Sequence, residues 1–539
     1  MNKTTINIRL LTVILVLFLS FLFLFNTGKR DFWAPDEPRY AQVSKEMRDS
    51  GNFILPQLNS EPYPHKPPLL FWMINLFSVP FGKITHLSAR LPSALAGVGC
   101  CLILFNFARN VFHNTRIGLL SALILATSIK FLWMTHRAAF DVLLTFFVMA
   151  ALFSFYKGYK EAGNKGRYYT LFYIFMALGT LTKGPVGFLL PFLVVVAYLS
   201  LKRDIKVLKE TKPWIGGVLF AILVFSWVYL AGIYGGKEYT QQILFKQNIG
   251  RFADSFAHKR PLYYYFIHFP LNYFPWTIFI PGVVVYLFSR EGRKRFQEVV
   301  FPAVWFVVIF FFFSIVSGKR DIYVLPLYPA ASLIIAWFLN EFVEQFRDIR
   351  FRKTGYIPCY FISGLTIFLG FLLPLGIYKF RPEHIRLTIP FVLLLFAGGI
   401  IMLRFIKHSR ILPFLFVLIL LVFSLFTLST LQVIPLLNQY KSAKEICDKA
   451  NAAMKPGDQL AMYNFLRDSY LFYTNRNHLP VINDSEDLKK YMNSNERVFL
   501  FIRDKDFKKV SESQDIPIFV IARDSVGHRE MLFVSNKDI

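Results

Sequence analysis

Cysteine is scarce in this chain of 539 residues, and its four copies show no regular spacing. Cys100 and Cys101 are adjacent inside one apolar run, Cys359 lies in another, and Cys447 stands alone near the C-terminus. A disulfide framework or a structural zinc site needs several cysteines at characteristic spacings. The sequence therefore predicts neither.

Acidic residues are also few: 34 Asp and Glu face 61 Lys and Arg, which gives a formal charge of +27. The basic residues do not form one patch but fall in short clusters between apolar runs. Such clusters orient membrane helices, whereas a nucleic-acid-binding surface gathers its positive charge on one face. We therefore expect no nucleic-acid partner.

Apolar residues dominate the chain: they make up 55% of it, 61 residues are Phe, and the mean hydropathy is +0.43. A helix of about 20 apolar residues crosses the roughly 30 Å of a bilayer's hydrocarbon. The first run, Ile8–Thr27, lacks a small-residue cleavage site, so we expect a retained span. In all, about thirteen spans are predicted, at 8–27, 88–108, 117–135, 139–157, 168–182, 185–201, 214–234, 270–289, 299–317, 321–343, 355–378, 389–405 and 411–430.

The short basic clusters fall mainly in alternate connections between these spans. By the positive-inside rule those connections face the cytoplasm. The opposite, extracytoplasmic face then carries the stretch after the first span, the turn at Lys183, the connection 235–269, the turn 317–321 and everything after residue 430. A turn at 379–388 on that face is also basic, so positive charge outside is not confined to one place.

The stretch Asp31–Pro68 collects most of the reactive side chains. Asp36 fits a helix N-cap before an amphipathic helix over Pro38–Asp49. Asp36, Arg39 and Tyr40 would share one face of this helix. A carboxylate beside a guanidinium stays ionised and can accept a proton.

A second group follows in the segment that contains Tyr63, His65 and Lys66. Its prolines stiffen the backbone, so little entropy is lost when the segment binds a ligand. A phenol, an imidazole and an ammonium group on such a backbone suit an anion.

Charged residues also lie at the edge of the membrane. Lys183 occupies a tight turn between two short spans, where it is either a functional group or a snorkelling anchor. Asp141 begins a span, one turn after Arg137. It could pair with Arg137 or orient a substrate hydroxyl.

Two further outer connections are basic and aromatic. The connection 235–269 contains Arg251, His258 and Arg260, and the later turn contains Lys319 and leads to Tyr323. Each cluster alone fits either a wall of an anion site or a set of interfacial anchors. Their occurrence on one predicted face favours the anion site.

After Thr430 the composition becomes that of a soluble protein, and we predict a membrane domain at 1–430 and a small α/β domain at 431–539. No phosphate loop or nucleotide fingerprint occurs in this tail. Helices are expected at 440–453 and 484–493, and strands at Gln459–Asn464, Arg497–Arg503, Ile516–Arg523 and Glu530–Ser535.

Carboxylates and cations on the outer face suit an enzyme that transfers a group from a lipid-linked phosphate to a hydroxyl. Lys66, Lys183, Arg251 and Arg260 could neutralise a departing phosphate, and Asp36 could take the proton of an incoming hydroxyl. A secondary transporter or flippase for a lipid-linked or anionic substrate is the alternative, because intramembrane charges are common in transporters.

Five spaced motifs carry a family resemblance: Asp36–Ala41, Gly51–Pro56, Tyr63–Leu69, Leu181–Pro185 and Gly318–Pro326. In this order they resemble the aminoarabinose transferase and protein O-mannosyltransferase superfamily of GT-C glycosyltransferases. The resemblance implies an inverting enzyme of the bacterial inner membrane that uses a polyprenyl-phosphate sugar donor and a glycolipid, lipid A, glycan or protein acceptor. It also implies a polytopic helical fold of about thirteen spans, surface helices in about 31–87 and 235–269, and a periplasmic α/β domain.

The same resemblance assigns roles to individual residues. It makes Asp36 the catalytic carboxylate and Asp141 a second acidic group. Together with the anion-binding argument above, it gives this set of substrate contacts: Glu37, Arg39, Tyr40, Tyr63, Lys66, Lys183, Arg251, Arg260, Lys319 and Tyr323.

One residue departs from the family pattern. His65 precedes the lysine where the aminoarabinose transferases have Glu. A divalent metal ion would then need His65, His258 and Glu37; otherwise the two imidazoles form hydrogen bonds or contact an anion. No cofactor is required by the sequence.

Overall fold

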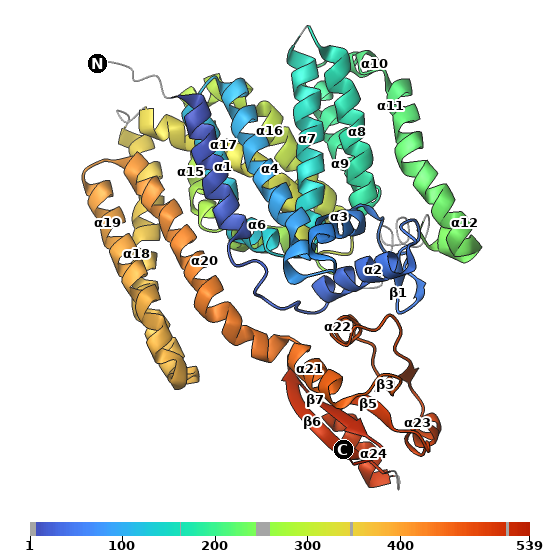
Figure 1. The fold of residues 1–539 in the computed structure, drawn as a ribbon. Coiled ribbons are helices and arrows are strands. Elements are labelled where there is room, and N and C mark those ends of the chain that lie inside the picture. The colour runs from blue at the N-terminus through green and yellow to red at the C-terminus, as the bar shows by residue number, and fades with distance from the viewer. Residues whose placement is uncertain (1–6, 162, 244–258, 345–348, 514–516, 539) are drawn as a thin grey trace. The chain divides into compact units, whose positions relative to one another are not determined.

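The computed structural model describes residues 7–161, 163–243, 259–344, 349–513 and 517–538 (Figure 1). Long helices fill most of the chain up to residue 441, and a mixed α/β region follows. The helical elements of the first part are α1 (Ile8–Leu24), α2 (Asp36–Ser50), α3 (Leu69–Ser78), η1 (Val79–Phe81), α4 (His86–Phe112), α5 (Thr115–Ala126), α6 (Ile129–Thr135), α7 (Phe140–Lys160), α8 (Lys165–Lys183), α9 (Val186–Leu201), α10 (Val207–Glu210), α11 (Pro213–Phe220), η2 (Ala221–Phe225), α12 (Ser226–Gln241), α14 (Tyr264–Asn272), η4 (Trp276–Phe279), α15 (Ile280–Phe288), α16 (Arg290–Ile315), η5 (Asp321–Leu327), α17 (Tyr328–Glu344), α18 (Ile349–Phe380), η6 (Pro382–Thr388), α19 (Ile389–Lys407) and α20 (Ile411–Lys441).

The predicted class, a polytopic helical membrane protein, is confirmed. Within the described residues, eight helices are long and apolar enough to cross a membrane, or ten if each of two bent pairs is one span. The predicted number of about thirteen is not confirmed. Three predicted spans lie outside these ten: 8–27 and 185–201 are the shorter apolar helices α1 and α9, and 168–182 is α8.

Two of the predicted spans are pairs of helices with a sharp bend between them. The predicted span 117–135 is α5 and α6, bent by 69°, and the span 270–289 falls on α14 and on η4 with α15, bent by 112°. Pro275 stands at the second break and lacks the amide N–H that a continuing helix would use. Hydropathy reports the apolar run but not its direction.

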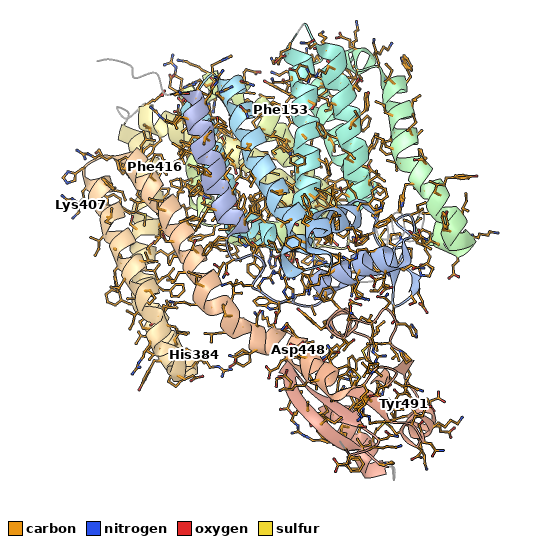
Figure 2. All side chains as sticks on the ribbon, in the orientation of Figure 1. Phe153, His384, Lys407, Phe416, Asp448 and Tyr491 are labelled. Atoms are coloured by element: carbon orange, nitrogen blue, oxygen red, sulfur yellow. The ribbon has the colours of Figure 1, made fainter. Side chains whose placement is uncertain are left out.

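The hairpin of α18 and α19 fits the predicted alternation of turns. His384 in η6 and Lys407 at the end of α19 lie at opposite ends of that hairpin (Figure 2). They belong to a predicted outer and a predicted cytoplasmic connection. Which side of the membrane each end faces stays a prediction.

A tight turn joins α8 to α9 at Lys183. Gly184 has φ +78°, a conformation that glycine adopts easily, and Pro185 precedes the first residue of α9. Farther along, Gly187 lies so close to Gly179 that an added Cβ would sit 2.0 Å from a backbone carbon. The two helices therefore leave the turn in close contact.

The described chain divides into two compact units. The first unit is Met1–Phe25, His65–Leu70 and Pro92–Ser429, and the second is Asn26–Pro64, Phe71–Leu91 and Thr430–Ile539. The second unit thus combines the stretch after the first span with the C-terminal region. The domain boundary at residue 430 stays a prediction.

The C-terminal region contains the predicted small α/β fold. Its five strands follow the order β4-β3-β5-β7-β6, with β4, β3 and β5 parallel and β5, β7 and β6 antiparallel. Alternate residues of the central strands point to two separate apolar cores, one on each face of the sheet. The elements are α21 (Lys444–Ala453), β3 (Gln459–Tyr463), α22 (Asp468–Tyr473), β4 (Val481–Ile482), α23 (Ser485–Met492), β5 (Val498–Arg503), α24 (Asp504–Ser513), β6 (Phe519–Val526) and β7 (Arg529–Ser535).

The same unit holds α2 and a short hairpin of β1 (Gln57–Leu58) with β2 (Glu61–Pro62). The carboxylate of Glu46 on α2 accepts from the backbone amides of Asn59 (2.9 Å) and Ser60 (3.0 Å) at the hairpin turn. Asn59 also receives the amide of Leu479 (2.8 Å), and Gln42 donates to the carbonyl of Arg476 (2.9 Å). These bonds fix α2 and the hairpin to the C-terminal region.

The predicted cap of α2 was wrong by one residue. The helix begins at Asp36 itself, and Pro35 occupies the cap position in a helical conformation without a side-chain bond. Asp36 and Glu37 therefore both lie in the first turn, where negative charge is favourable.

Candidate functional site

A buried cluster of three charges holds the start of α2. Glu37 is fully buried, and its carboxylate lies 2.8 Å from Nε of Arg90 and 2.8 Å from Nη1 of Arg30. Arg90 also donates to the backbone carbonyls of Thr27 (2.7 Å) and Asp31 (2.9 Å). The carboxylate of Glu37 thus holds guanidinium groups in this structure, and its predicted contact with substrate stays a prediction.

Arg39, one turn into α2, pairs with a residue of the C-terminal region. Its Nε lies 2.8 Å from Oδ2 of Asp468 on α22. Burial alone would lower the pKa of Arg39, but the charges of Asp468, Tyr63 and Tyr40 and the hydrogen bond to Asp468 together outweigh it and raise the pKa. Burial raises the pKa of Asp468, Arg39 opposes this, and the charge of Asp36 adds to it.

The second unit therefore brings together four predicted residues, Asp36, Arg39, Tyr40 and Tyr63, around one that the sequence did not indicate. Tyr40 and Tyr63 are mostly buried and contact the ring of Phe71. No local pattern marks Asp468 as a site residue, because its partner is more than 400 positions away.

Arg30 and Arg90 were also missed. Arg90 carried a usable signal, since it is a charged residue within the predicted span 88–108 and such residues are rare without a role.

In the first unit, Lys183 meets Asp141 and Tyr323. Its Nζ lies 2.5 Å from Oδ1 of Asp141 and 4.5 Å from the ring centre of Tyr323. Lys183 is thus one partner of Asp141, and Arg137, the partner considered from the sequence, lies over the ring of Trp133. Both members of the ion pair are largely shielded from solvent.

Lys66 belongs to the same neighbourhood. Its Nζ lies 5.8 Å from the ring centre of Phe140, the residue next to Asp141. His65, just before it, is exposed. Lys66, Asp141, Lys183 and Tyr323 are therefore contributed by separate segments to one region of the first unit.

Lys319, in the turn after α16, contacts backbone carbonyls. Its side chain is buried, and Nζ donates to the backbone carbonyls of Arg260 (3.0 Å) and Val316 (2.6 Å). Burial lowers the pKa of Lys319. In this structure it ties two connections together, and its contact with substrate stays a prediction, as does that of the exposed Arg260.

Two predicted residues, Arg251 and His258, lie outside the described residues. The metal site proposed for His258 with His65 and Glu37 therefore stays a prediction. Among the residues that the structure describes, no three His, Cys, Asp or Glu side chains gather to hold a metal ion.

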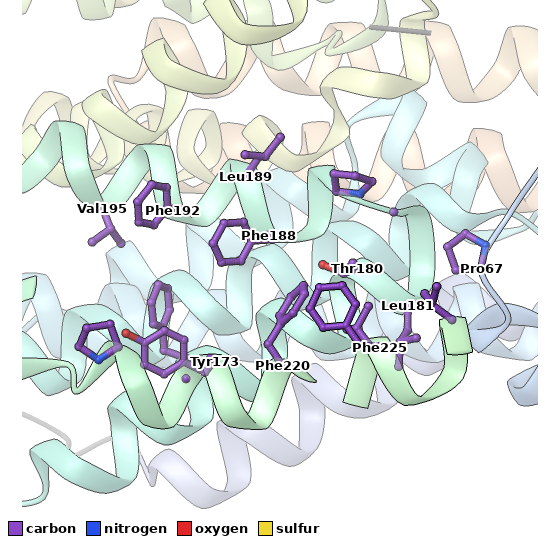
Figure 3. Close-up of a pocket in the computed structure, with 18 of the residues that line it drawn as sticks. Pro67, Tyr173, Thr180, Leu181, Phe188, Leu189, Phe192, Val195, Phe220 and Phe225 are labelled. Carbon is purple, nitrogen blue, oxygen red and sulfur yellow. The ribbon is translucent and has the colours of Figure 1, made fainter. Parts of the chain in front are cut away.

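An apolar cavity of about 730 Å³ lies along α8, α9, α11 and α12 of the first unit (Figure 3). Phe188 and Phe220 face each other in it, with ring centres 5.5 Å apart. Its lining includes Gly184, the neighbour of Lys183, and Pro67, the neighbour of Lys66. An apolar volume thus adjoins the segments that carry both lysines.

The sequence was compared with protein families and with known proteins. Residues 65–229 match the family model of the dolichyl-phosphate-mannose-protein mannosyltransferases. An undecaprenyl phosphate-alpha-4-amino-4-deoxy-L-arabinose arabinosyl transferase of Pectobacterium atrosepticum is 30% identical over 69% of this chain and 67% of its own. An uncharacterized protein of Aquifex aeolicus is 30% identical over 89% of each chain.

Among solved structures, ArnT from Cupriavidus metallidurans bound to undecaprenyl phosphate superposes with a TM-score of 0.81 at 20% identity, covering 99% of each chain. The fold is therefore that of the GT-C membrane glycosyltransferases. The chain belongs to the aminoarabinose transferase and protein O-mannosyltransferase superfamily, as its motifs predicted, and it is a glycosyltransferase. The comparisons give no support to the alternative of a transporter or flippase.

Proposed function

We propose that this enzyme moves a sugar from a polyprenyl-phosphate donor to an acceptor on the extracytoplasmic side of the bacterial inner membrane, with inversion at the sugar carbon. The observation that carries the proposal is the large apolar cavity whose lining adjoins Lys66 and Lys183. A polyprenyl chain needs an apolar volume, and its phosphate needs cations at one end of that volume. The relative from Pectobacterium atrosepticum, whose name gives undecaprenyl phosphate as the carrier of its sugar, supports the same donor.

Lys183 is the first candidate to stabilise the leaving phosphate. Its ammonium group is held by Asp141 beside Tyr323, so the fold fixes its position. As the bond from the sugar carbon to the phosphate oxygen breaks, the new negative charge would be stabilised by this preorganised cation and by Lys66.

Asp36 is the proposed base. It would take the proton of the acceptor while the acceptor oxygen attacks the sugar carbon from the side opposite the phosphate. Arg39 is already paired with Asp468, so its charge is partly balanced. The acceptor proposed is a glycolipid, lipid A, a glycan or a protein.

The donor is tested with purified protein in lipid nanodiscs. Radiolabelled sugar on undecaprenyl phosphate is offered with a bacterial glycolipid extract, and the same sugar on a short, water-soluble phosphate serves as the comparison. We expect label transfer and release of undecaprenyl phosphate only with the long-chain donor, because only that chain fills the apolar cavity. Equal use of both donors would remove the reason for this assignment.

Replacing Lys183 with Met is expected to lower kcat about 10²–10³-fold, the usual effect of losing one preorganised group that stabilises developing charge. Lys165→Met is the matched control, because Lys165 is an exposed lysine at the other end of α8. Single-turnover transfer separates the loss from donor binding. Normal turnover in the Lys183→Met enzyme would exclude Lys183 from stabilising the leaving group.

A further inference from the structure

A second cavity, of about 310 Å³, lies in the second unit and takes no part in the proposed chemistry. It is lined by the segment before α2, the end of α20, the region around α22, and the β6–β7 turn. Gly527 in that turn has φ +72°, and its amide donates to the carbonyl of Tyr440 at 2.6 Å. The turn is therefore fixed in place against the end of α20.

The cavity has an unbalanced positive charge. Its lining includes the side chains of Lys441, Arg467, Arg503, Arg529 and His528, and none of the described residues that line it is Asp or Glu. Arg503 is already engaged, since its Nε lies 2.6 Å from Oδ2 of Asp506. Within the described part of the chain, Arg467 and Arg529 form no ion pair at all.

Arg467 and Arg529 are also close enough to repel each other. Burial lowers the pKa of Arg467, and the charge of Arg529 lowers it further. Both residues line the same cavity, and an anion between their guanidinium groups would relieve the repulsion.

A buried hydroxyl adds a second, independent observation. Tyr470 lines the cavity, is 2% exposed, and its hydroxyl has no hydrogen-bond partner among the described residues. A buried polar atom without a partner is uncommon and often marks the place of an absent ligand or water. Burial raises the pKa of Tyr470, the charge of Asp524 adds to this rise, and the charges of Arg467 and Arg529 oppose it.

The cavity also adjoins the proposed base. Pro35, which precedes Asp36, is part of the lining, and Arg467 precedes Asp468, the partner of Arg39. An anion bound here would therefore lie next to the first turn of α2.

We propose that this cavity binds a phosphate monoester. Guanidinium forks match the oxygens of phosphate in pairs, and two guanidinium groups without a carboxylate partner, beside a lysine, suit a dianion better than a single carboxylate. Arg529 is also held by a hydrogen bond from its Nε to Nε2 of His528 at 3.3 Å. The phosphate would come either from the headgroup of a phosphorylated acceptor, which rests on the proposed function, or from free phosphate, which does not.

Binding is measured first, without any transfer reaction. Full-length protein in phosphatidylcholine nanodiscs is titrated with methyl phosphate and, separately, with inorganic phosphate by isothermal calorimetry. The double variant Arg467→Gln/Arg529→Gln is expected to bind methyl phosphate at least about tenfold more weakly, since hydrogen bonds to charged groups are lost. Arg523→Gln is the control, because Arg523 is an exposed arginine of the same sheet outside the cavity.

A fold defect is separated from a binding defect by Arg467→Lys/Arg529→Lys, which keeps the charge, and by comparing thermal unfolding of all variants. Recovery of part of the affinity in the lysine pair supports the site. Absence of methyl phosphate binding to the unchanged protein, or equal binding by the Gln variant, overturns it.

The source of the phosphate is settled by transfer kinetics. If it belongs to the acceptor, the Gln variant raises KM for a phosphorylated glycolipid but not for its dephosphorylated form. If the Gln variant binds both methyl phosphate and inorganic phosphate more weakly but keeps the same KM for both glycolipids, the ligand is free phosphate. Failure of the unchanged enzyme to transfer sugar would refute the proposed function while the binding result still stands.

Discussion

Replacing Asp36 with Asn lowers the rate of sugar transfer by about 10²–10⁴-fold, the usual contribution of a positioned general base. The substitution keeps the size of the side chain and removes only its ability to accept a proton. Asp36 lies in the first turn of α2, where the interaction of an acid with the helix terminus contributes about 0.3–1 kcal/mol, so thermal unfolding of the variant is measured alongside its rate.

The measurement is transfer of labelled sugar from undecaprenyl phosphate under single-turnover conditions, with donor binding measured in parallel. Asp487→Asn serves as the control, because Asp487 is an exposed aspartate in the first turn of α23. We expect donor affinity to be nearly unchanged in the Asp36 variant. A normal rate in that variant would mean that another group accepts the proton.

Replacing Glu37 with Gln has the largest expected effect on stability. The change leaves Arg30 and Arg90 buried side by side without their carboxylate. Removing one partner of a buried ion pair typically costs about 3–5 kcal/mol, because the remaining charge stays out of water. Thermal unfolding of the purified protein should therefore begin at a clearly lower temperature.

Glu344→Gln provides the comparison. Glu344 pairs with Arg116 at 3.3 Å, but both side chains are well exposed, and such pairs contribute about 0–1 kcal/mol. Its unfolding temperature should hardly change. If the Glu37 variant behaves the same way, the buried cluster does not hold the start of α2 as described.

The sequence predicted the helices and strands whose formation depends on a local property of the chain. The length of the apolar runs predicted most of the membrane spans. Alternating or continuous apolar residues predicted four of the five strands of the C-terminal sheet. The brief strand β4, with two residues, carries too little pattern to be noticed. Short helices such as α22 depend on tertiary packing rather than on their own periodicity.

The sequence indicated several side chains that the structure brings together, but it did not indicate which of them form pairs. Lys183 and Asp141 were both selected, yet the partner considered for Asp141 was its neighbour Arg137, because only nearby residues can be paired by helical spacing. Asp468 and Arg39 are joined only by the fold.

The ion pair of Arg39 with Asp468 also limits how this enzyme can evolve or be shortened. A protein cut after its last membrane helix would leave an uncompensated cation beside its proposed base, in addition to losing the soluble segment. Grafting the tail of a relative would succeed only if the new tail supplied a carboxylate at the matching place. The C-terminal region is therefore exchangeable only together with the residues of α2 that it contacts, and not as an independent module.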